Sequence, residues 1–419
     1  MWLHLEQGAD VPTRRSQGDG SLYRAANGLW RAAVTLPSVD GKRRRKVVSS
    51  TNKTVAMAKL RKLRKEVAEG RAAVTGSTTV GRWMRKWVDE IHGPSLRPKA
   101  YTDYESIIRL HITPAIGHKR LDALSAEDVR AMYREMQKTS TRTAAQSHII
   151  LRKALGDAMK EGVLGINITD AVKKPKHTPT PPEPLNAEQC KALLRSCIDT
   201  EDPLAPLWAT AFLTAPRPGE LLGIELDRTN LEHGIFELSW QLQQLNRQKH
   251  GCGDETPDGW PCKKVRASAC PKRYWDMPPG FEYRPLYRSL VLTRPKTKTG
   301  TRIVPIPAPL WAMLNVHVEN MQGANPSNLL WHHPDGRPIS PREHHTLWKA
   351  ALQRAGLPDA PPYVSRHTTA TLLSQADVPE EIRMQIMGQS SVVAHRGYTH
   401  IDQTQTRKAL ANLDHLLLA

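Results

Sequence analysis

Residues 363–401 read YVSRHTTATLLSQADVPEEIRMQIMGQSSVVAHRGYTHI and carry the densest set of reactive side chains in the protein. Arg366 opens a helical pattern, a Gly-Gln-Ser-Ser element starts at Gly388, and Tyr398 follows nine residues after Gln389. An arginine guanidinium can hold a phosphate through two parallel hydrogen bonds. A tyrosine hydroxyl can attack phosphorus and hold it as an ester. The segment therefore predicts chemistry on a phosphate group.

Two earlier stretches supply further groups that suit this chemistry. LTAPRPGELLGIEL places Arg217 at a turn before a helix, and RPKTKTGTRIVPIP predicts a hairpin with Lys296 and Lys298 near its tip. Two arginines would neutralise the charge that builds on the non-bridging oxygens of one phosphate. A lysine on a mobile hairpin would donate a proton to the leaving oxygen. Each residue alone is unremarkable, and only their joint order favours a catalytic set.

Charge and composition narrow the class of partner and cofactor. The 419 residues hold 60 Lys and Arg against 41 Asp and Glu, a net charge of +19 that indicates a polyanionic partner. Neither a Walker-type glycine loop nor a carboxylate cluster suited to Mg²⁺ is evident in the sequence, which favours phosphoryl transfer without a catalytic cofactor. Five unevenly spaced cysteines indicate a reducing, cytoplasmic setting. No run of apolar residues is as long as the about 18 residues that a membrane-spanning helix requires, so no membrane partner is expected.

The N-terminal residues 1–70 predict a small basic domain. Turns at Asn27-Gly28 and Asp40-Gly41 separate three strand-like pieces, and a helix is expected over 54–69 with Val55, Leu63 and Val67 on one face. The third strand carries a run of cations. These side chains either contact DNA or form a solvated face of the domain. The candidate DNA-binding residues of this run are Arg43, Arg44, Arg45 and Lys46.

The rest of the chain divides into a helical domain, a linker and a large mixed domain. Residues 75–172 predict helices only, with a capping box at Ser125 to Asp128. The prolines of residues 173–184 predict an extended linker. Residues 185–419 combine strands with helices. The expected fold class is therefore multidomain, mainly α with small β-sheets, and its last domain is α+β.

A long polar segment interrupts the last domain at about residues 241–290. It is rich in Gly and Pro and contains His250, Cys252, Cys262 and Cys270. One histidine and three cysteines suit tetrahedral zinc, although their spacing is not that of a CxxC pair. An irregular loop with free thiols is the alternative, so a structural zinc ion stays open at this point.

Taken together, these motifs resemble the tyrosine recombinases of phages and mobile elements, over nearly the whole chain. The stretches RHTTATLL, MGQSS and GYTHI follow the order and spacing of that family. The resemblance implies an arm-type DNA-binding domain at 1–70, a SAM-like core-binding domain at 75–172 and a catalytic domain at 185–419. It makes Arg217 and Arg366 the catalytic arginines and Tyr398 the nucleophile. Its lysine is Lys296 or Lys298, and we favour Lys296.

Two positions depart from the family pattern. Tyr363 stands where the family usually has histidine, three residues before Arg366, and Gln389 stands where it has histidine or tryptophan. Both side chains can donate a hydrogen bond to a phosphate oxygen. Neither can serve as a general base near neutral pH as histidine does. The departures therefore bear on the rate of the reaction more than on its type.

The resemblance implies a site-specific integrase that breaks and rejoins DNA through a covalent 3′-phosphotyrosyl intermediate. Four protomers would assemble on two attachment sites, with an excisionase and a host DNA-bending protein as further partners. Leu410, Leu413 and Leu417 near the C-terminus would dock on a neighbouring protomer or pack on their own domain. One alternative function is that of a DNA-binding relative whose catalytic activity is weakened by Tyr363 and Gln389. A second is that of a relaxing enzyme of the type IB topoisomerase kind, against which the arm-type domain argues.

Overall fold

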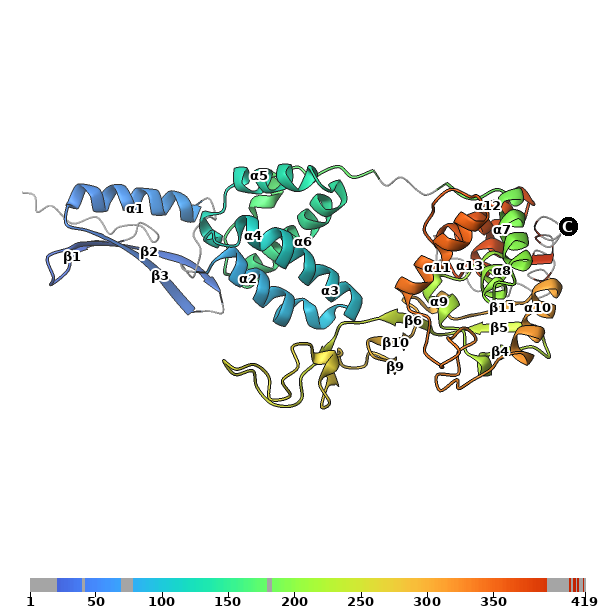
Figure 1. Ribbon diagram of the computed structural model, residues 1–419. Coiled ribbons are helices and arrows are strands. Elements are labelled where there is room, and N and C mark those ends of the chain that lie inside the picture. The colour runs from blue at the N-terminus through green and yellow to red at the C-terminus, as the bar shows by residue number, and fades with distance from the viewer. Residues whose placement is uncertain are drawn as a thin grey trace, which may run out of the picture. The chain divides into compact units, whose positions relative to one another are not determined.

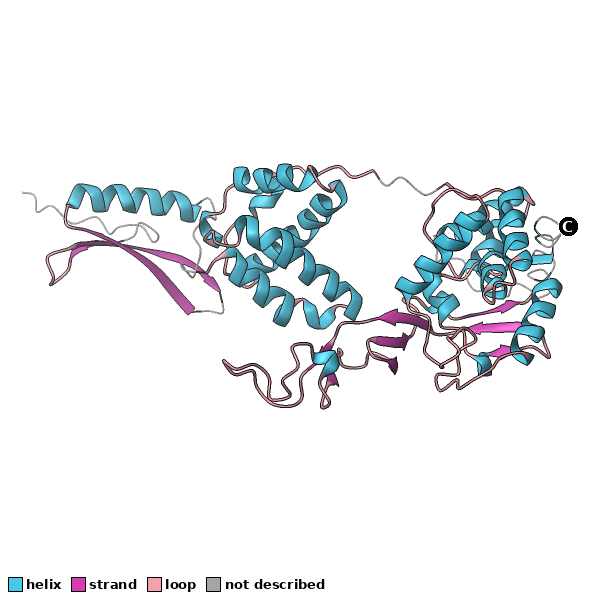
Figure 2. Ribbon diagram, viewed as in Figure 1, coloured by secondary structure: helices cyan, strands magenta, loops and turns pink. Residues whose placement is uncertain are grey.

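The computed structural model describes residues 21–39, 42–68, 78–178 and 183–389, together with Arg407, Leu410, Ala411, Leu413 and Leu417. The chain forms two compact units, residues 1–178 and 179–419, and the boundary falls inside the segment predicted as a linker. Figures 1 and 2 show a small sheet with one helix, then a helical bundle, then a mixed unit. Among the described residues, no helix has both the length and the apolar character needed to cross a bilayer.

The first part of unit 1 is a three-stranded antiparallel sheet covered on one face by a helix. Strands β1 (Ser21–Arg24), β2 (Trp30–Val39) and β3 (Lys42–Ser50) lie in sequence order, and α1 (Lys53–Ala68) follows. Ala32 and Val34 of β2 pack against Leu60 and Leu63 of α1. Val55, expected on the packed face of the helix, is instead 45% exposed. The stripe that contacts the sheet begins one residue later, because Ala56 and Leu60 complete its first two turns.

The second part of unit 1 is a bundle of helices with its own core. Its α-helices are α2 (Val80–Lys86), α3 (Pro98–Ile107), α4 (Thr113–Ile116), α5 (Ala126–Gln137) and α6 (Thr141–Lys160). The expected capping box at the start of α5 is confirmed, since Ser125 and Asp128 exchange both hydrogen bonds. The indole N–H groups of Trp83 and Trp87 donate to the Ala154 carbonyl and the Asp157 carboxylate on α6, each at 2.9 Å. These contacts fix α2 and the turn after it against the longest helix.

In the described part of unit 2, seven helices pack around one apolar core and two small three-stranded sheets. The helices are α7 (Ala187–Asp199), α8 (Ala205–Leu213), α9 (Pro218–Leu222), α10 (Ala308–Glu319), α11 (Pro341–Arg354), α12 (Val364–Gln375) and α13 (Glu380–Met387). Helix α8 is buried along its whole length and contacts α7, α10 and α12. The central helix thus sets the positions of the two helices that carry the predicted arginines, because α9 follows it and α12 packs on it.

The sheets of unit 2 share one long segment. Strands β4 (Thr229–Asn230), β5 (Ile235–Leu238) and β11 (Arg302–Pro305) form one sheet, and β6 (Gln241–Gln244), β9 (Tyr283–Tyr287) and β10 (Leu290–Thr293) form another. Leu238 of β5 pairs with Arg302, and Gln241 of β6 pairs with Thr293. Strands β10 and β11 therefore pair one after the other along the same side of the β5–β6 segment.

The prediction that the lysine stretch forms a hairpin is wrong. Strands β10 and β11 do not pair with each other, because each takes the β5–β6 segment as its antiparallel partner. Residues 294–301 form an excursion between the two strands, with a short 3-10 turn at Lys298–Gly300. Two contacts hold its first residue: Gln241 Nε2 donates to the Arg294 carbonyl, and Arg294 Nη1 donates to the Ser239 carbonyl.

The insertion lies between β6 and β9. The strands at its ends belong to the sheet, so the segment that leaves the sheet spans residues 245–282, narrower than the predicted 241–290. A two-residue ribbon, β7 (Gln248–Lys249) with β8 (Tyr274–Trp275), forms its base. Arg247 secures that base by donating to the Asp276 carbonyl and carboxylate at 2.8 and 3.0 Å.

Candidate active site

Arg217 is held at the start of α9 by the helix that it precedes. Its backbone N–H and its Nη1 both donate to the Glu220 carboxylate, at 2.9 and 2.6 Å. Its Nη2 donates to the Gly388 carbonyl at 3.0 Å, 171 residues away in the chain. Pro218 at the first helical position suits this geometry, since it has no N–H to leave unpaired. The guanidinium is thus aimed at the turn after α13.

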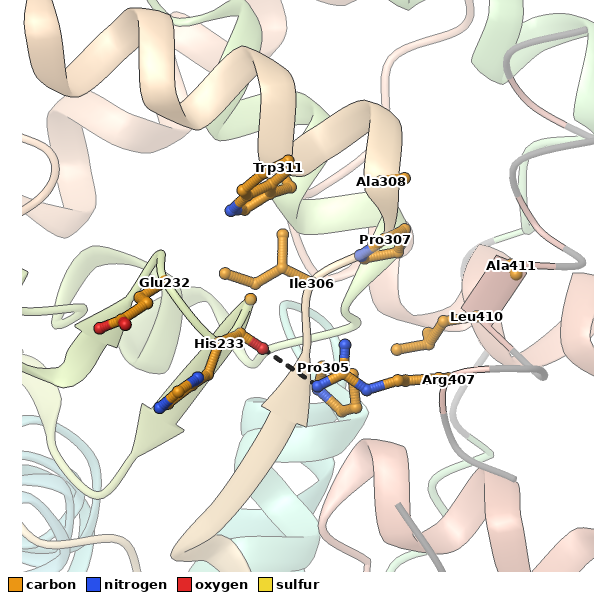
Figure 3. A pocket seen from close by; sticks show the side chains of 11 residues that line it. Glu232, His233, Pro305, Ile306, Pro307, Ala308, Trp311, Arg407, Leu410 and Ala411 are labelled. Atoms are coloured by element: carbon orange, nitrogen blue, oxygen red, sulfur yellow. Dashed lines mark hydrogen bonds between the residues drawn. The ribbon is translucent and has the colours of Figure 1, made fainter. Parts of the chain in front are cut away.

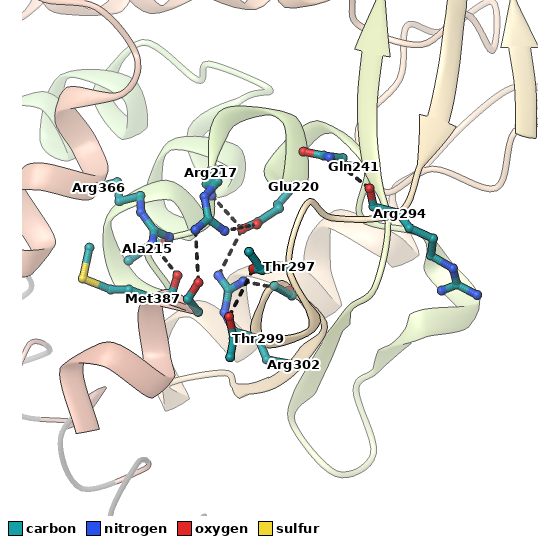
Figure 4. A network of polar contacts seen from close by, with 12 residues as sticks. Ala215, Arg217, Glu220, Gln241, Arg294, Thr297, Thr299, Arg302, Arg366 and Met387 are labelled. Atoms are coloured by element: carbon teal, nitrogen blue, oxygen red, sulfur yellow. Dashed lines mark hydrogen bonds and ion pairs between the residues drawn. The ribbon is translucent and has the colours of Figure 1, made fainter. Parts of the chain in front are cut away.

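Arg366 reaches the same turn from the first turn of α12. Only 1% of its surface is exposed, and its Nη1 donates to the Ala215 carbonyl at 2.6 Å while its Nη2 donates to the Met387 carbonyl. Arg217 and Arg366 therefore reach adjacent carbonyls (Figure 4). Burial, and next the charges of Arg217 and Arg302, lower the pKa of Arg366 to about 10, so it remains charged at neutral pH.

A third arginine, Arg302, completes the cluster and was not among the predicted site residues. It lies on β11, is 8% exposed, and donates to the Ile386 carbonyl at 2.8 Å, the Gly300 carbonyl at 3.2 Å and the Glu220 carboxylate at 3.1 Å. The signal in the sequence was an arginine between a turn and the apolar IVPIP strand, where an inward-facing position requires a partner. Glu220, paired with two arginines, is the matching buried carboxylate.

The electrostatics of the cluster are those of an anion site. Glu220 is 1% exposed; burial acts to raise its pKa, but the charges of Arg302 and Arg217 outweigh burial and hold the pKa below its usual range. The cluster thus holds three guanidinium groups and one carboxylate, which pairs directly with Arg217 and Arg302, so a net positive charge remains. Buried cations are costly unless an anion compensates them. The arrangement therefore favours a phosphate diester as the group that completes it.

Gly388 joins the arginines to the lysine excursion. It ends α13 in the left-handed region at φ +56°, and an added Cβ would lie 2.8 Å from both Arg302 Nη1 and the Thr299 carbonyl oxygen. A side chain is excluded here by backbone conformation and by space alike. The turn at Gly388 therefore packs directly on the excursion that carries Lys296.

The remaining predicted site residues stand at the edge of the cluster or outside the described residues. Gln389 directly follows the turn and is exposed, and Lys296 is exposed on the excursion. Tyr363 precedes α12, is 40% exposed and meets the His367 ring edge-on at 5.0 Å. The Lys298 side chain and Tyr398 lie outside the described residues. The structure thus brings Arg217 and Arg366 together and leaves the choice of lysine open.

Two surfaces of unit 1 are candidate nucleic-acid interfaces. Register places Arg31 and Arg45 on the sheet face that α1 leaves uncovered, while Lys46 pairs with the buried Val34 on the covered face. The side chains of Arg43 and Arg44 lie outside the described residues. On the helical bundle, two surface grooves of about 600 and 470 Å³ are lined mainly by cations, and Asp157 and Asp170 pair with some of the cations in the larger one. The cations include Arg130, Arg134, Arg152, Lys153, Lys160, Lys173, Lys174 and Lys176.

A cavity of about 350 Å³ lies beside the C-terminal segment (Figure 3). Trp311, Ile306 and Leu410 line it, and Arg407 donates to the His233 carbonyl at 3.0 Å. None of the predicted catalytic residues lines this cavity. Leu410, Leu413 and Leu417 are buried in the core of their own unit, which is the second of the two expected placements.

The structure also gathers the four candidate zinc ligands of the insertion. His250, Cys252, Cys262 and Cys270 each place a ligand atom within 4.8 Å of the other three. Their convergence is notable because the spacing in the sequence follows no common zinc motif. This cluster belongs to the insertion and has no contact with the arginine site among the interactions described here.

Comparisons with known proteins identify the family. Residues 79–137 match the phage integrase N-terminal SAM-like domain, and residues 287–405 match the phage integrase family. An integrase of Saccharopolyspora erythraea is 30% identical over 416 residues, which cover 93% of this chain and 94% of the relative.

Two solved structures share the fold. The Tn1549 transposon integrase in complex with transposon right-end DNA aligns with a TM-score of 0.58 at 18% identity, covering 80% of this chain and 99% of that one. The lambda integrase tetramer bound to a Holliday junction aligns with a TM-score of 0.52 at 14% identity, covering 94% and 99%. With a relative this similar over nearly its full length, and with two arginines converging on one turn, the chain belongs to the phage integrase family of tyrosine recombinases.

Proposed function

We propose that this recombinase breaks and rejoins double-stranded DNA at attachment sites by transferring a DNA 3′-phosphate to Tyr398. The observation that carries the proposal is the convergence of Arg217 and Arg366 on adjacent carbonyls from segments about 150 residues apart. Their forks match the two non-bridging oxygens of a phosphodiester. Arg302 and Glu220 hold the arginines in place and do not themselves contact DNA in this scheme.

The reaction balances without an external energy source. The Tyr398 hydroxyl gives its proton to water as its oxygen bonds to phosphorus, and the bond from phosphorus to the 5′-bridging oxygen breaks. Lys296 gives a proton to that leaving oxygen and regains one from solvent. A 5′-hydroxyl from the partner strand then attacks the phosphotyrosine and releases Tyr398. The ester retains the energy of the phosphodiester, so no nucleotide is consumed. Tyr363 and Gln389 act as neutral hydrogen-bond donors to the phosphate.

Binding of DNA falls to the two basic surfaces of unit 1. The grooves beside α5 and α6 contact the core site, and the uncovered face of the β1–β3 sheet contacts a second, arm-type site. Both assignments rest on cations grouped on exposed faces, which bind phosphates by releasing counterions. Four protomers act together on two DNA duplexes, as the lambda tetramer on a Holliday junction supports. An excisionase and a host DNA-bending protein complete the expected set of partners.

The decisive experiment replaces Tyr398 with Phe and uses a nicked suicide substrate that contains the native core site. The substitution removes one oxygen atom, so DNA affinity should remain within about twofold while the covalent protein–DNA adduct disappears. The adduct is measured by denaturing electrophoresis, and affinity by gel shift. An adduct that persists in Tyr398→Phe would assign the nucleophile to another residue. Failure of the parent protein to form any adduct on a bound substrate would favour the weakened DNA-binding relative.

A further inference from the structure

The ligand atoms of the insertion cluster have the spacing of a tetrahedral metal site. His250 Nδ1 lies 3.4 Å from Cys262 Sγ and 3.8 Å from Cys252 Sγ. Zinc bonds of about 2.3 Å to sulfur and about 2.1 Å to nitrogen, at tetrahedral angles, place the two ligand atoms about 3.6 Å apart. The two measured distances fall on either side of that value. Cys270 Sγ belongs to the same group, within 4.8 Å of the others.

The insertion has no apolar core that could gather these residues. None of its described residues from 246 to 282 belongs to the hydrophobic core of unit 2. Its regular structure is confined to the β7–β8 ribbon and a 3-10 turn at Ala267–Ala269. A segment of fewer than about 40 residues without a core usually needs a disulfide or a metal to hold one conformation. The three cysteines are free thiols, so no disulfide supplies the link.

The backbone around the cluster is built for a close approach of its two ends. His250 follows β7 directly, and Cys270 lies four residues before β8, so the ribbon brings both to one place. A Cβ on Gly251 would lie 2.2 Å from the Lys272 carbonyl oxygen, which only glycine permits. The Gly251 and Lys272 N–H groups donate to the Cys270 sulfur, and the Lys264 N–H donates to the Cys262 sulfur. These backbone donors help to fix the positions of the two sulfur atoms.

Aromatic packing fixes the plane of the histidine ring. His250 stacks on Trp260 with ring centroids 4.0 Å apart and an angle of 5° between planes. Its Nδ1 faces the sulfur atoms, as the two distances above show. Its Nε2 is buried with no hydrogen-bond partner among the described residues. Stacking, rather than a hydrogen bond to the outer nitrogen, therefore orients this side chain.

We propose that His250, Cys252, Cys262 and Cys270 bind one zinc ion that holds the insertion in its folded conformation. Three thiolates and an imidazole are soft and intermediate ligands that select zinc over Mg²⁺ or Ca²⁺. The chain fills all four positions of the tetrahedron, which is typical of a structural site and leaves no position for water or substrate. The ion thus takes the place of the missing core in this segment.

The test measures metal in the full-length protein purified without chelator. Mass spectrometry of the metal content should find about one zinc per chain, and X-ray absorption should find three sulfur ligands near about 2.3 Å and one nitrogen near about 2.0–2.1 Å. Cys270→Ser and Cys262→Ser should lower the zinc content at least tenfold. Cys190→Ala is the matched control, because Cys190 is a buried thiol on α7, away from the cluster, and it should keep its zinc.

Hydrogen exchange separates loss of the metal from global unfolding. In Cys270→Ser, exchange should speed up in residues 250–273 and stay unchanged in α8, whose protection reports the core of unit 2. Parent protein that contains less than about a tenth of an equivalent of zinc, and takes up none when zinc is added, would overturn the proposal. Equal zinc content in Cys270→Ser and the parent, or a disulfide within the cluster, would overturn it as well.

Discussion

At the scale of single residues, the site depends on how one carboxylate is shared. Glu220 accepts from Arg217 on its own helix and from Arg302 on β11, while Arg302 also holds the Ile386 and Gly300 carbonyls. Arg302 thereby ties the start of α9, the end of α13 and the lysine excursion to one another. Removing it would release all three segments, although it carries no atom that must touch DNA. We regard Arg302 as a positioning residue.

Replacing Arg302 with Lys should therefore slow cleavage while leaving DNA affinity intact. Lysine keeps the charge but has no planar fork to serve three acceptors at once. A displacement of catalytic groups by about 1 Å can cost roughly 100-fold, so we expect single-turnover cleavage to fall by about 10- to 100-fold. Suicide-substrate cleavage and gel-shift affinity are the paired measurements. The exposed Arg337, paired with Asp335, gives the control Arg337→Lys. Parent-like cleavage by Arg302→Lys would remove its positioning role.

The catalytic arginines could be predicted from motifs in the sequence, whereas the strand pattern around Arg302 indicated only an inward-facing arginine and did not identify its partners. Arg217 and Arg366 stand within motifs whose order and spacing mark their chemistry, independently of the fold. Arg302 acquires its role only through three contacts with residues 2, 82 and 84 positions away. Pairings of that kind depend on tertiary packing, which local sequence patterns do not encode.

At the scale of elements, strand pairing was the feature least accessible from sequence. The pattern LVLT, then PKTKTG, then RIVP reads as a hairpin because a turn separates two apolar strands. The two strands instead continue one another along β5–β6, and the turn between them projects as an excursion. Helices were easier to predict, as the capping box at Ser125 shows, since their signals are local. Pairing requires knowledge of the partner strand, which lies about 50 residues away for β10 and more than 60 residues away for β11.

Helix α11 offers a prediction on pH. His344 is 3% exposed and stacks on Trp208, and burial, aided by the nearby His345, lowers its pKa from 6.5 to about 4. The unfolded chain therefore binds a proton below pH 6.5 that the folded chain excludes down to about pH 4. The free energy of unfolding should fall as the pH drops through that window, by about 2 kcal/mol between pH 7 and pH 5 from this group.

Urea unfolding at pH 7 and pH 5 checks this effect. His344→Phe keeps the aromatic stack but cannot be protonated, so it should lose less stability on acidification than the parent. His233→Gln changes an exposed histidine of the same unit that is not among the groups acting on His344, and it serves as the control. The same acid sensitivity in His344→Phe as in the parent would show that another group is responsible.

At the scale of the whole molecule, the sheet β1–β3 and helix α1 have an apolar cluster of their own. The apolar cluster of β2 and α1 shares no residue with the core of the helical bundle. The boundary between the two units could be recognised in the sequence because the linker is rich in proline. The placement of Leu410, Leu413 and Leu417 could not, since an apolar stripe does not specify whether it packs on its own core or on a neighbour.

Deleting residues 1–70 should consequently abolish binding to the arm-type site and spare binding to the core site. Each phosphate contact that is lost should reduce the slope of log K against log salt by about 0.9, so the truncated protein should show a shallower salt dependence on DNA carrying both sites. Within the intact chain, Arg45→Ala should reproduce part of that change, because Arg45 lies on the uncovered face of the sheet. Lys62→Ala removes an equal charge from the exposed side of α1 and should alter the slope less. Titrations by fluorescence anisotropy at several salt concentrations supply the slopes, and identical slopes for the full-length and truncated proteins would mean that the sheet does not touch DNA.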